Sequence, residues 1–195
     1  MKMSKIFYLM GKSASGKDTV YKRIQEELPE LKPLVIYTTR PIREKETEGV
    51  EYHFVDEIQL REFQKAGKVI ELRDYHTVHG IWHYFTVDDG QFDSERHLLA
   101  IGTPESYGAM RDYFGQERLV PLYLEVDDGV RLERALKRER KQKEPKYKEM
   151  CRRFLADAED FSEENLEKAG IGKRYVNEDI EKCTEEILLG IQEVL

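Results

Sequence analysis

The chain has 195 residues and carries 39 acidic against 32 basic side chains, a formal net charge of −7. This length fits one domain with a sizeable core, and the acidic balance argues against a general nucleic-acid-binding surface. No apolar stretch approaches the length of a membrane span, and the N-terminus lacks a signal-peptide pattern. The two cysteines form neither a disulfide framework nor a zinc spacing. We therefore expect a cytoplasmic protein that binds neither nucleic acid nor membranes.

The first elements of the chain are a strand, a glycine-rich loop and a helix. Residues 6–10 are apolar, and a helical pattern runs to about Leu28, just before Pro29. Between them lies G-x-x-x-x-G-K, the pattern of a P-loop, whose backbone N–H groups surround phosphates at a helix N-terminus while the lysine reaches the outer phosphates. The flanking strand and helix are the context this motif requires. We predict a nucleoside triphosphate site at Gly11, Ser13, Ala14, Ser15, Gly16, Lys17, Asp18 and Thr19.

Asp18 departs from the usual motif, which places Ser or Thr after the lysine to ligate magnesium. A carboxylate is also a hard oxygen ligand, so Asp18 can hold Mg²⁺ directly or through water, with Thr19 supplying a hydroxyl one position later. Asp18 can equally favour the helix N-terminus, where negative charge is stabilising. The two roles are compatible, and both stay open from the sequence.

The next part of the chain no longer alternates regularly between strand and helix. Residues 34–39 predict a second strand, and a charged loop and a short strand at 52–55 follow. A helix is expected over 56–67, with Asp56 as N-cap and Gly67 at its end. Two further strands, joined around His79-Gly80, predict a hairpin. The region from 40 to 90 therefore looks like a small antiparallel insert.

Strand–helix alternation then resumes. A buried strand over 97–103 is followed by Thr103 as a cap and Pro104 at the first helical position. Another strand covers 119–126, and two basic helices follow, one from Asp127 to near Pro145 and one to about residue 161. A last strand at 173–177 and an amphipathic helix close the chain. Repeated units of this kind predict a mainly parallel sheet with helices on both faces.

Arg40 and Arg43 stand on either side of a proline just beyond the second strand, and Tyr52 follows a loop that must double back. Two guanidinium forks held close together suit a dianionic phosphate monoester, and a tyrosine hydroxyl adds a third donor. Alone, an R-P-x-R pair is a common surface feature. Its place one crossover after a P-loop favours a second phosphate site.

Three histidines, His76, His79 and His83, lie in the expected hairpin beside Trp82. No cysteine or carboxylate completes an obvious metal-binding set with them. We expect solvated hairpin residues, with base stacking or substrate contact as the alternative. Trp82 is expected to cover the core of the insert.

In its order of motifs the chain resembles the guanylate kinase family of nucleoside monophosphate kinases. The P-loop, T-T-R-x-x-R at 38–43, G-x-x-Y-x-F-V at 49–55, Ile70-Glu71 and V-N-x-D at 176–179 follow one another as in that family, and the likeness runs from residue 6 to 195. It implies an α/β P-loop three-layer fold with a mainly parallel sheet. Residues 1–39 and 91–195 would form the core, with a helical lid at about 137–153, and residues 40–90 the small antiparallel NMP-binding insert.

The resemblance also implies roles for single residues, with Mg-ATP as the donor and GMP or dGMP as the acceptor. Substrate contacts are implied for Arg40, Arg43, Tyr52, Glu71, Tyr84 and Thr86, of which Glu71 resembles the carboxylate that reads a guanine edge. Asn177 matches an asparagine beside the adenine of ATP. The residues implied in catalysis are Lys17, Arg40, Arg43 and the lid arginines Arg138, Arg140 and Arg152.

The chain departs from the family pattern at several positions. Ile36 replaces a serine, and Ala100 and Gly102 stand where the family strand has two aspartates, one reading guanine and one near the metal. Kinase chemistry survives these changes better than guanine specificity does. Two alternatives stay open: a kinase of the same fold for another nucleotide or small acceptor, and a non-catalytic guanylate-kinase-like binding module. A GTPase is disfavoured because no N-K-x-D motif is present. Both a monomer and a homodimer are compatible with the sequence.

Overall fold

The structure is a computed structural model that describes residues 3–44, 46–77, 80–92 and 95–195. Its main sheet has five strands in the order β2-β7-β1-β8-β9, and every neighbouring pair runs parallel. These strands are β1 (Ile6–Gly11), β2 (Lys32–Pro33), β7 (Leu98–Gly102), β8 (Leu119–Glu125) and β9 (Arg174–Val176). The parallel sheet predicted from the alternation of strands and helices is confirmed.

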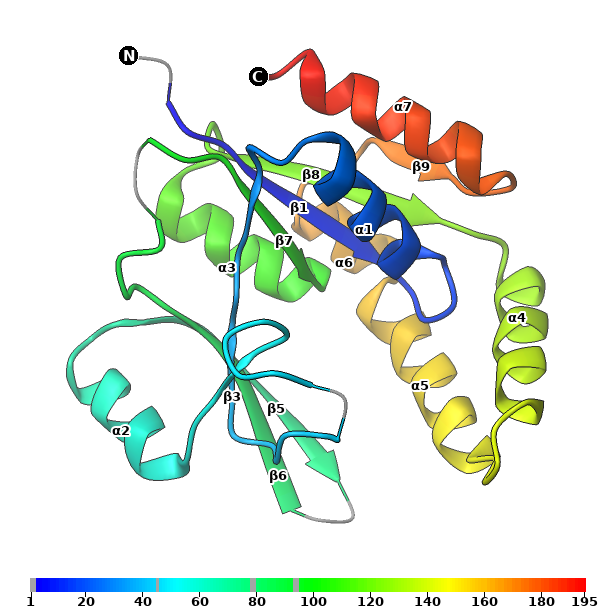
Figure 1. Ribbon diagram of the computed structural model, residues 1–195, viewed down its shortest axis with the longest axis horizontal. Helices are drawn as coiled ribbons and strands as arrows, with labels where there is room; N and C mark the ends of the chain where they lie inside the picture. The colour runs from blue at the N-terminus through cyan, green and yellow to red at the C-terminus, as the bar shows by residue number, and fades with distance from the viewer. Residues whose placement is uncertain (1–2, 45, 78–79, 93–94) are drawn as a thin grey trace.

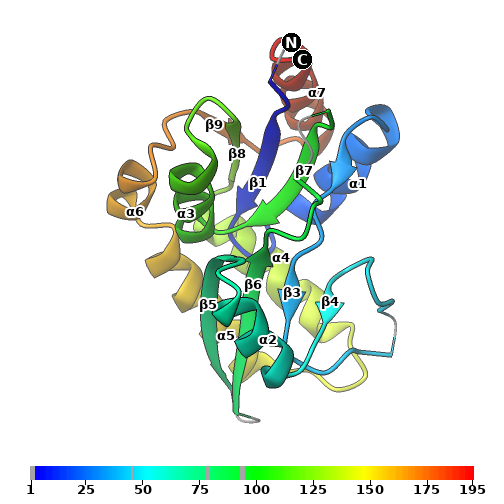
Figure 2. The same ribbon diagram turned by 90° about the vertical axis from the view of Figure 1, so that its left-hand side faces the viewer.

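Helices cover both faces of this sheet. They are α1 (Lys17–Glu27), α3 (Pro104–Phe114), α6 (Glu163–Lys168) and α7 (Ile180–Gln192). α1 and α7 pack on one face, and α3 and α6 on the other (Figures 1 and 2). The side chains of β1 alternate accordingly, since Phe7 and Leu9 join the core under α1 and α7, while Tyr8 and Met10 join the core under α3. The three-layer α/β fold is therefore confirmed.

A second, smaller sheet lies below the first in Figure 1. Its order is β4-β3-β6-β5, with bounds β3 (Tyr37–Thr38), β4 (His53–Phe54), β5 (Val69–Thr77) and β6 (Gly80–Val87). β6 pairs antiparallel with β3 and with β5, and β3 pairs parallel with β4. α2 (Glu57–Lys65) packs Leu60 against Phe85 and Val87 of this sheet. Its N-cap is Asp56, as predicted, in a capping box with Gln59.

The strand predicted over residues 34–39 is wrong as a single element. Lys32–Pro33 pairs with β7 in the main sheet, whereas Tyr37–Thr38 pairs with β6 in the small sheet. Between them the chain crosses from one sheet to the other, and Leu34 still donates its N–H to the Leu99 carbonyl at 2.9 Å. One buried strand and two short strands in succession both produce an apolar run, so the sequence does not reveal the crossing. The short helix α6 is also absent from the sequence prediction, because six residues are too few to show a helical period.

Two helices, α4 (Asp128–Arg140) and α5 (Tyr147–Asp160), follow β8. Asp127 caps α4 by accepting from the Val130 N–H at 3.1 Å, and the helix ends before Pro145, as predicted. The small sheet and the α4–α5 pair lie on either side of the carboxyl end of the main sheet (Figure 1). In open α/β sheets this is the edge where ligands bind.

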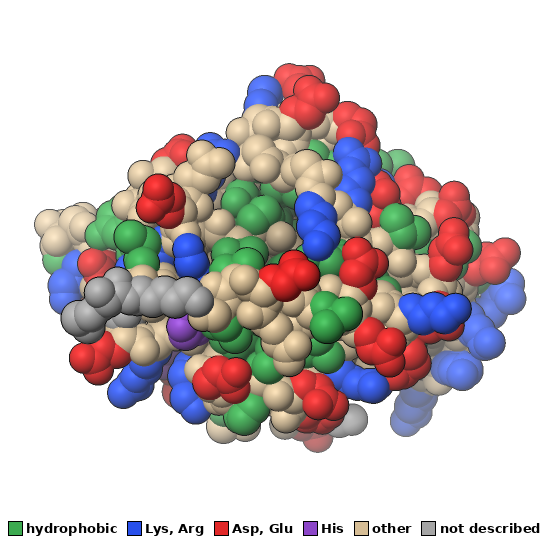
Figure 3. Space-filling model, turned by 90° about the horizontal axis from the view of Figure 1, so that it is seen from above, with side chains coloured by type: hydrophobic (Ala, Val, Ile, Leu, Met, Phe, Trp, Pro, Cys, Tyr) green, Lys and Arg blue, Asp and Glu red, His purple; other side chains and the backbone are tan. Residues whose placement is uncertain are grey.

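Acidic and basic side chains lie intermixed over the face of the molecule shown in Figure 3. This mixture agrees with the modest net charge of the chain. Within the part of the chain that the structure describes, no helix is both long and apolar enough to cross a bilayer.

Candidate active site

The P-loop connects β1 to α1, and its backbone has the conformation that the glycine pattern predicts. Gly16 has a φ of 93°, in the left-handed region that disfavours residues with a Cβ. A Cβ there would lie 2.8 Å from Asn177 Nδ2 and 2.9 Å from Ile180 Cδ1. Ala14 also has a positive φ, of 63°. The loop therefore wraps tightly at the N-terminus of α1, where backbone N–H groups favour an anion.

A pocket of about 230 Å³ opens at this loop. Its lining residues are Ala14, Ser15, Gly16, Lys17, Asp18, Thr19, Arg134 and Arg138. Lys17 Nζ lies 3.4 Å from Asp18 Oδ1, and the Asp18 side chain is 80% exposed. The pocket therefore combines three cationic side chains, those of Lys17, Arg134 and Arg138, with the single carboxylate of Asp18. This excess of positive charge at a helix N-terminus suits a polyanion.

Arg134 is a pocket residue that the sequence prediction missed. It lies one turn before Arg138 on α4, and residues four apart share a face of a helix. That spacing was the available signal, but it is also the spacing of any solvated basic face. Arg140 and Arg152 are not among the described residues that line the pocket. Arg152 instead forms an ion pair with Glu149, with Nε 2.8 Å from Oε2.

Asn177 lies beneath the P-loop and is almost completely buried. Its side-chain amide donates to the Ser15 carbonyl oxygen at 2.7 Å. The residue follows directly on β9, so the end of this strand supports the loop. The resemblance placed Asn177 beside the adenine of ATP, and the structure adds a contact to the phosphate loop itself.

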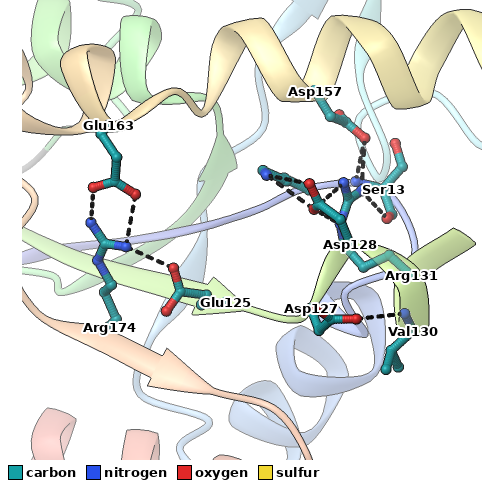
Figure 4. Close-up of polar contacts among 10 residues, drawn as sticks. Ser13, Glu125, Asp127, Asp128, Val130, Arg131, Asp157, Glu163 and Arg174 are labelled. Carbon is teal, nitrogen blue, oxygen red and sulfur yellow. Dashed lines mark hydrogen bonds and ion pairs between the residues drawn. The ribbon is translucent and has the colours of Figure 1, made fainter.

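Arg131 joins the P-loop to both helices of the α4–α5 pair (Figure 4). Its side chain is 1% exposed and donates to Asp128 Oδ1 at 2.7 Å and to the Ser13 carbonyl oxygen at 3.0 Å. Asp157 of α5 lies 3.5 Å from the same guanidinium and accepts from the Ser13 N–H at 2.8 Å. The Arg131 guanidinium also lies 4.6 Å from the centre of the Phe154 ring. In the sequence alone, Arg131 is only one more arginine of a basic helix.

Replacing Arg131 with methionine should destabilise the protein by about 3 kcal/mol, because Asp157, whose side chain is 15% exposed, would keep its charge without its partner. The affinity for ATP should also fall, since the Ser13 segment of the P-loop would lose its support. Urea unfolding and calorimetric titration with ATP measure the two effects. Lys137→Met, at an exposed position of the same helix, is the matched control. Equal stability of the two variants would contradict this account.

The second predicted anion site centres on Arg40, whose side chain is 2% exposed. Its Nη1 and Nη2 donate to the two oxygens of Glu46 at 2.7 and 2.6 Å, and its Nε donates to the Tyr84 hydroxyl at 3.0 Å. Nη1 also donates to the Pro41 carbonyl oxygen. The hydrogen bond from Arg40 holds the pKa of Glu46 below its usual value of 4.5. Glu46, which the sequence analysis missed, therefore fixes Arg40 in position.

The aromatic residues Tyr52, Phe54 and Tyr84 complete the surroundings of Arg40. The guanidinium lies 5.0 Å from the centre of the Tyr52 ring, and the Tyr52 and Tyr84 rings meet edge to face at 5.5 Å. Burial raises the pKa of Tyr52, so its hydroxyl stays a neutral donor. The structure thus brings Arg40, Tyr52 and Tyr84 together. Arg43 is exposed, and its backbone N–H donates to Glu46 Oε2 at 2.9 Å.

Further along the same face of the hairpin, Glu71 and Thr86 lie directly opposite each other. The Thr86 hydroxyl donates to Glu71 Oε1 at 2.7 Å. Arg73, two residues along β5, donates its Nε to Glu71 Oε2 at 2.9 Å. Because residues two apart on a strand share a face, Glu71 and Arg73 form one charged pair next to Tyr84. Arg73 is a site candidate that the sequence analysis did not name.

A second pocket, of about 250 Å³, lies where the hairpin faces the main sheet. It is lined by Leu72, Arg73, Asp74, Tyr75, Thr103, Glu105 and Asp160. Burial raises the pKa of Asp160, and the charges of Asp157 and Glu105 act in the same direction. The small sheet, α3 and the end of α5 therefore share one cavity.

Ala100 and Gly102, which stand where the family pattern has aspartates, lie in closely packed surroundings. Ala100 is 1% exposed within the core. A Cβ on Gly102 would come within 2.4 Å of the Tyr8 hydroxyl and 2.5 Å of Ser106 Oγ. Tyr8 donates to Ser106 at 2.8 Å, and burial raises its pKa to about 12. A neutral Tyr8–Ser106 pair fills the space that a carboxylate at position 102 would need.

The hairpin histidines show no metal site within the described part of the chain, where no group of three or more metal-ligating side chains occurs. His83 Nδ1 lies 2.6 Å from Asp74 Oδ1, and His76 is exposed. His79 lies outside the described residues. Trp82 is half-buried on β6, opposite Tyr75.

Comparisons with known proteins agree with this geometry. The family model of guanylate kinase matches residues 3–81. A guanylate kinase of Salinibacter ruber is 29% identical over 195 aligned positions, which cover 97% of this chain and 96% of that protein. Over nearly its whole length the chain is thus similar to guanylate kinases. A crystal structure of guanylate kinase from Anaplasma phagocytophilum shares the fold, with a TM-score of 0.67 and 21% identity over 98% of this chain and 86% of that chain.

Other guanylate kinases match a shorter segment of the chain. A guanylate kinase of Frankia casuarinae is 49% identical over 63 residues, 32% of this chain and 34% of that protein. In this shorter alignment the chain spans about a third of the length of the curated relative that it matches. The segment matched by the family model contains the P-loop, Arg40, Arg43, Tyr52 and Glu71. Tyr84, Thr86, Asn177 and the lid arginines lie beyond it.

Proposed function

We propose that the chain is a guanylate kinase, which transfers the γ-phosphate of ATP to GMP or dGMP and gives GDP or dGDP. The observation that supports the proposal is that one molecule holds two separate groups of cationic side chains, each of which suits an anion. One is the P-loop pocket with Lys17, Arg134 and Arg138, and the other is the buried Arg40 of the insert. Two such sites suit two phosphorylated substrates, whereas a peptide groove needs neither.

Transfer between phosphates depends chiefly on positioning and on neutralising charge. The P-loop amides and Lys17 would hold the β- and γ-phosphates. Arg138 and Arg134 would neutralise the negative charge of the transferred phosphoryl group. Arg40, Tyr84 and Tyr52 would hold the acceptor phosphate. Four of the five N–H groups of Arg40 already have partners in the protein, so the exposed Arg43 would supply the second cation.

Magnesium would enter with ATP, and the residues at the pocket fit it. Mg²⁺ typically binds one or two carboxylates together with substrate phosphates and water. Asp18 places a carboxylate at the pocket, and Thr19 adds a hydroxyl. The ion would neutralise charge on the phosphates. Because Asp18 is largely exposed, it can turn from Lys17 toward such an ion.

The small sheet and the α4–α5 pair would act as the parts that close on the substrates. Closure would exclude water and so suppress wasteful hydrolysis of ATP. Cys151 and Cys183 are both free thiols, which fits the cytoplasm as the proposed compartment.

A panel of acceptors tests the function directly. ADP release, measured by a coupled assay with Mg-ATP, should be rapid with GMP and dGMP and at least about 100-fold slower in kcat/KM with AMP or UMP. The difference is expected because the acceptor pocket would pair with one base edge only. Rapid turnover of UMP or AMP would favour a kinase for another acceptor. Binding of nucleotides without any ADP release would instead support a non-catalytic module.

A further inference from the structure

The 250 Å³ pocket adjoins the candidate acceptor residues, because Arg73 of its lining lies opposite Tyr84 in the hairpin and donates to Glu71. An acceptor base would enter the pocket at this end. Glu71, the carboxylate that resembles the guanine reader of the family, has a side chain only 3% exposed. Thr86 donates to its Oε1, and Arg73 donates to both of its oxygens, at 2.9 and 3.4 Å. Glu71 is not among the residues that line the 250 Å³ pocket, but Arg73 is. A base that enters this pocket therefore meets a guanidinium in front of the carboxylate.

Arg73 has donors to spare for a ligand. A guanidinium carries five N–H groups, and Glu71 takes two of them. The Arg73 side chain is 9% exposed, so only a few of its N–H groups, held in a fixed direction, reach the pocket. Tyr75, two residues along β5, forms a further hydrogen bond with Arg73. Such a group pairs with hydrogen-bond acceptors and repels donors.

The charges around the pocket exclude a second anionic group on the acceptor. Asp74, Glu105 and Asp160 line the same cavity, and the charge of Arg73 is already offset by Glu71. A second phosphate would therefore meet more carboxylates than cations. A neutral ring that carries acceptor atoms fits these walls better. Among purine edges, O6 and N7 form the acceptor pair that an arginine fork contacts in two places.

We infer that Arg73 donates to O6 and N7 of the acceptor base, so that the protein selects 6-oxopurine nucleotides without reading the 2-amino group of guanine. Glu71 is then a positioning residue that holds Arg73. This inference rests on the proposed function and narrows its substrate class. Inosine monophosphate carries the same O6 and N7 as GMP and lacks only the 2-amino group. Adenine presents an amino group where O6 would be, opposite the donors of Arg73.

The test compares kcat/KM for GMP, IMP and AMP in the coupled assay. For the natural chain we expect GMP and IMP to agree within about threefold and AMP to be at least about 100-fold poorer. In Arg73→Ala the Glu71 carboxylate is uncovered and can accept from the 2-amino group and N1–H. The preference for GMP over IMP should therefore rise at least tenfold, mainly through KM, because the base lies away from the transferred phosphate.

Arg61→Ala is the matched control, since Arg61 is an exposed arginine of α2 whose described ion pair is with Glu57. It should leave the ratio of kcat/KM for GMP to that for IMP unchanged.

A preference of the natural chain for GMP over IMP greater than about tenfold would overturn the inference, whether or not Arg73→Ala folds. An unchanged ratio in a folded Arg73→Ala would also overturn it. If neither nucleotide is phosphorylated, the proposed function fails, and calorimetry then decides: equal binding of GMP and IMP supports the reading of O6 and N7, and binding of GMP alone contradicts it.

Discussion

Lys17→Ala should lower kcat by roughly 10²- to 10³-fold, the loss typical when one preorganised donor to a developing charge is removed. Lys17 lines the P-loop pocket. Its described ion pair is with Asp18, at 3.4 Å, and the Asp18 side chain is 80% exposed. Exposed pairs of this kind contribute at most about 1 kcal/mol. The stability against urea should therefore stay close to that of the natural chain while phosphoryl transfer nearly stops.

Lys22→Ala is the control for this variant. Lys22 lies on the same helix at an exposed position outside the pocket lining. Single-turnover and steady-state rates with Mg-ATP and GMP compare the two variants, and urea unfolding measures their stability. A kcat of Lys17→Ala within about threefold of that of Lys22→Ala would contradict the assignment of the P-loop pocket to the triphosphate.

Arg40→Ala should damage both activity and stability. The guanidinium and the Glu46 carboxylate form a bidentate ion pair, and the side chains of Arg40 and Glu46 are 2% and 14% exposed. Removing one partner of a buried pair leaves the other charge desolvated, which costs about 3 kcal/mol. The acceptor phosphate would also lose the cation that Tyr84 and Glu46 hold in place. We expect kcat/KM for GMP to fall roughly 10³-fold, consistent with losses from removal of a buried charged contact.

Arg43→Ala separates the two effects of the Arg40 variant. Arg43 is exposed, and Glu46 bonds to its backbone N–H, which alanine retains. Its loss should reduce kcat/KM for GMP while the unfolding free energy changes by less than about 0.5 kcal/mol, as for most surface substitutions. Urea unfolding and the coupled assay on both variants test the contrast. If Arg43→Ala proves as unstable as Arg40→Ala, or if both retain full turnover, the second anion site is misassigned.

Much of the site depends on local sequence, and that part was predictable. The P-loop needs only a strand, a left-handed glycine at position 16 and a helix that begins at Lys17, all within one short segment. The capping boxes at Asp56 and Thr103 are equally local, because each cap and its partner are three residues apart. The hairpin is likewise set by two neighbouring strands of alternating residues.

The partners of the charged side chains could not be predicted in this way. Arg131 and Arg134 are both arginines of one basic helix, yet the first is buried against the P-loop and the second lines the pocket. Arg40 pairs with Glu46, and Arg73 covers Glu71. The sequence shows the charges, but packing decides which of them lose water and which carboxylate lies within reach.

By itself, then, the sequence determined the likeness to guanylate kinases, the three-layer order of strands and helices, and the P-loop with its lysine. Only the tertiary structure decided the crossing between the two sheets after Pro33, the exclusion of a carboxylate at Gly102 by Tyr8, and the exposure of Arg73 instead of Glu71 to the pocket. The physical reason is one of range. Strand, loop and helix signals arise from residues a few positions apart, whereas burial and ion pairing arise between segments that meet only after the chain has folded.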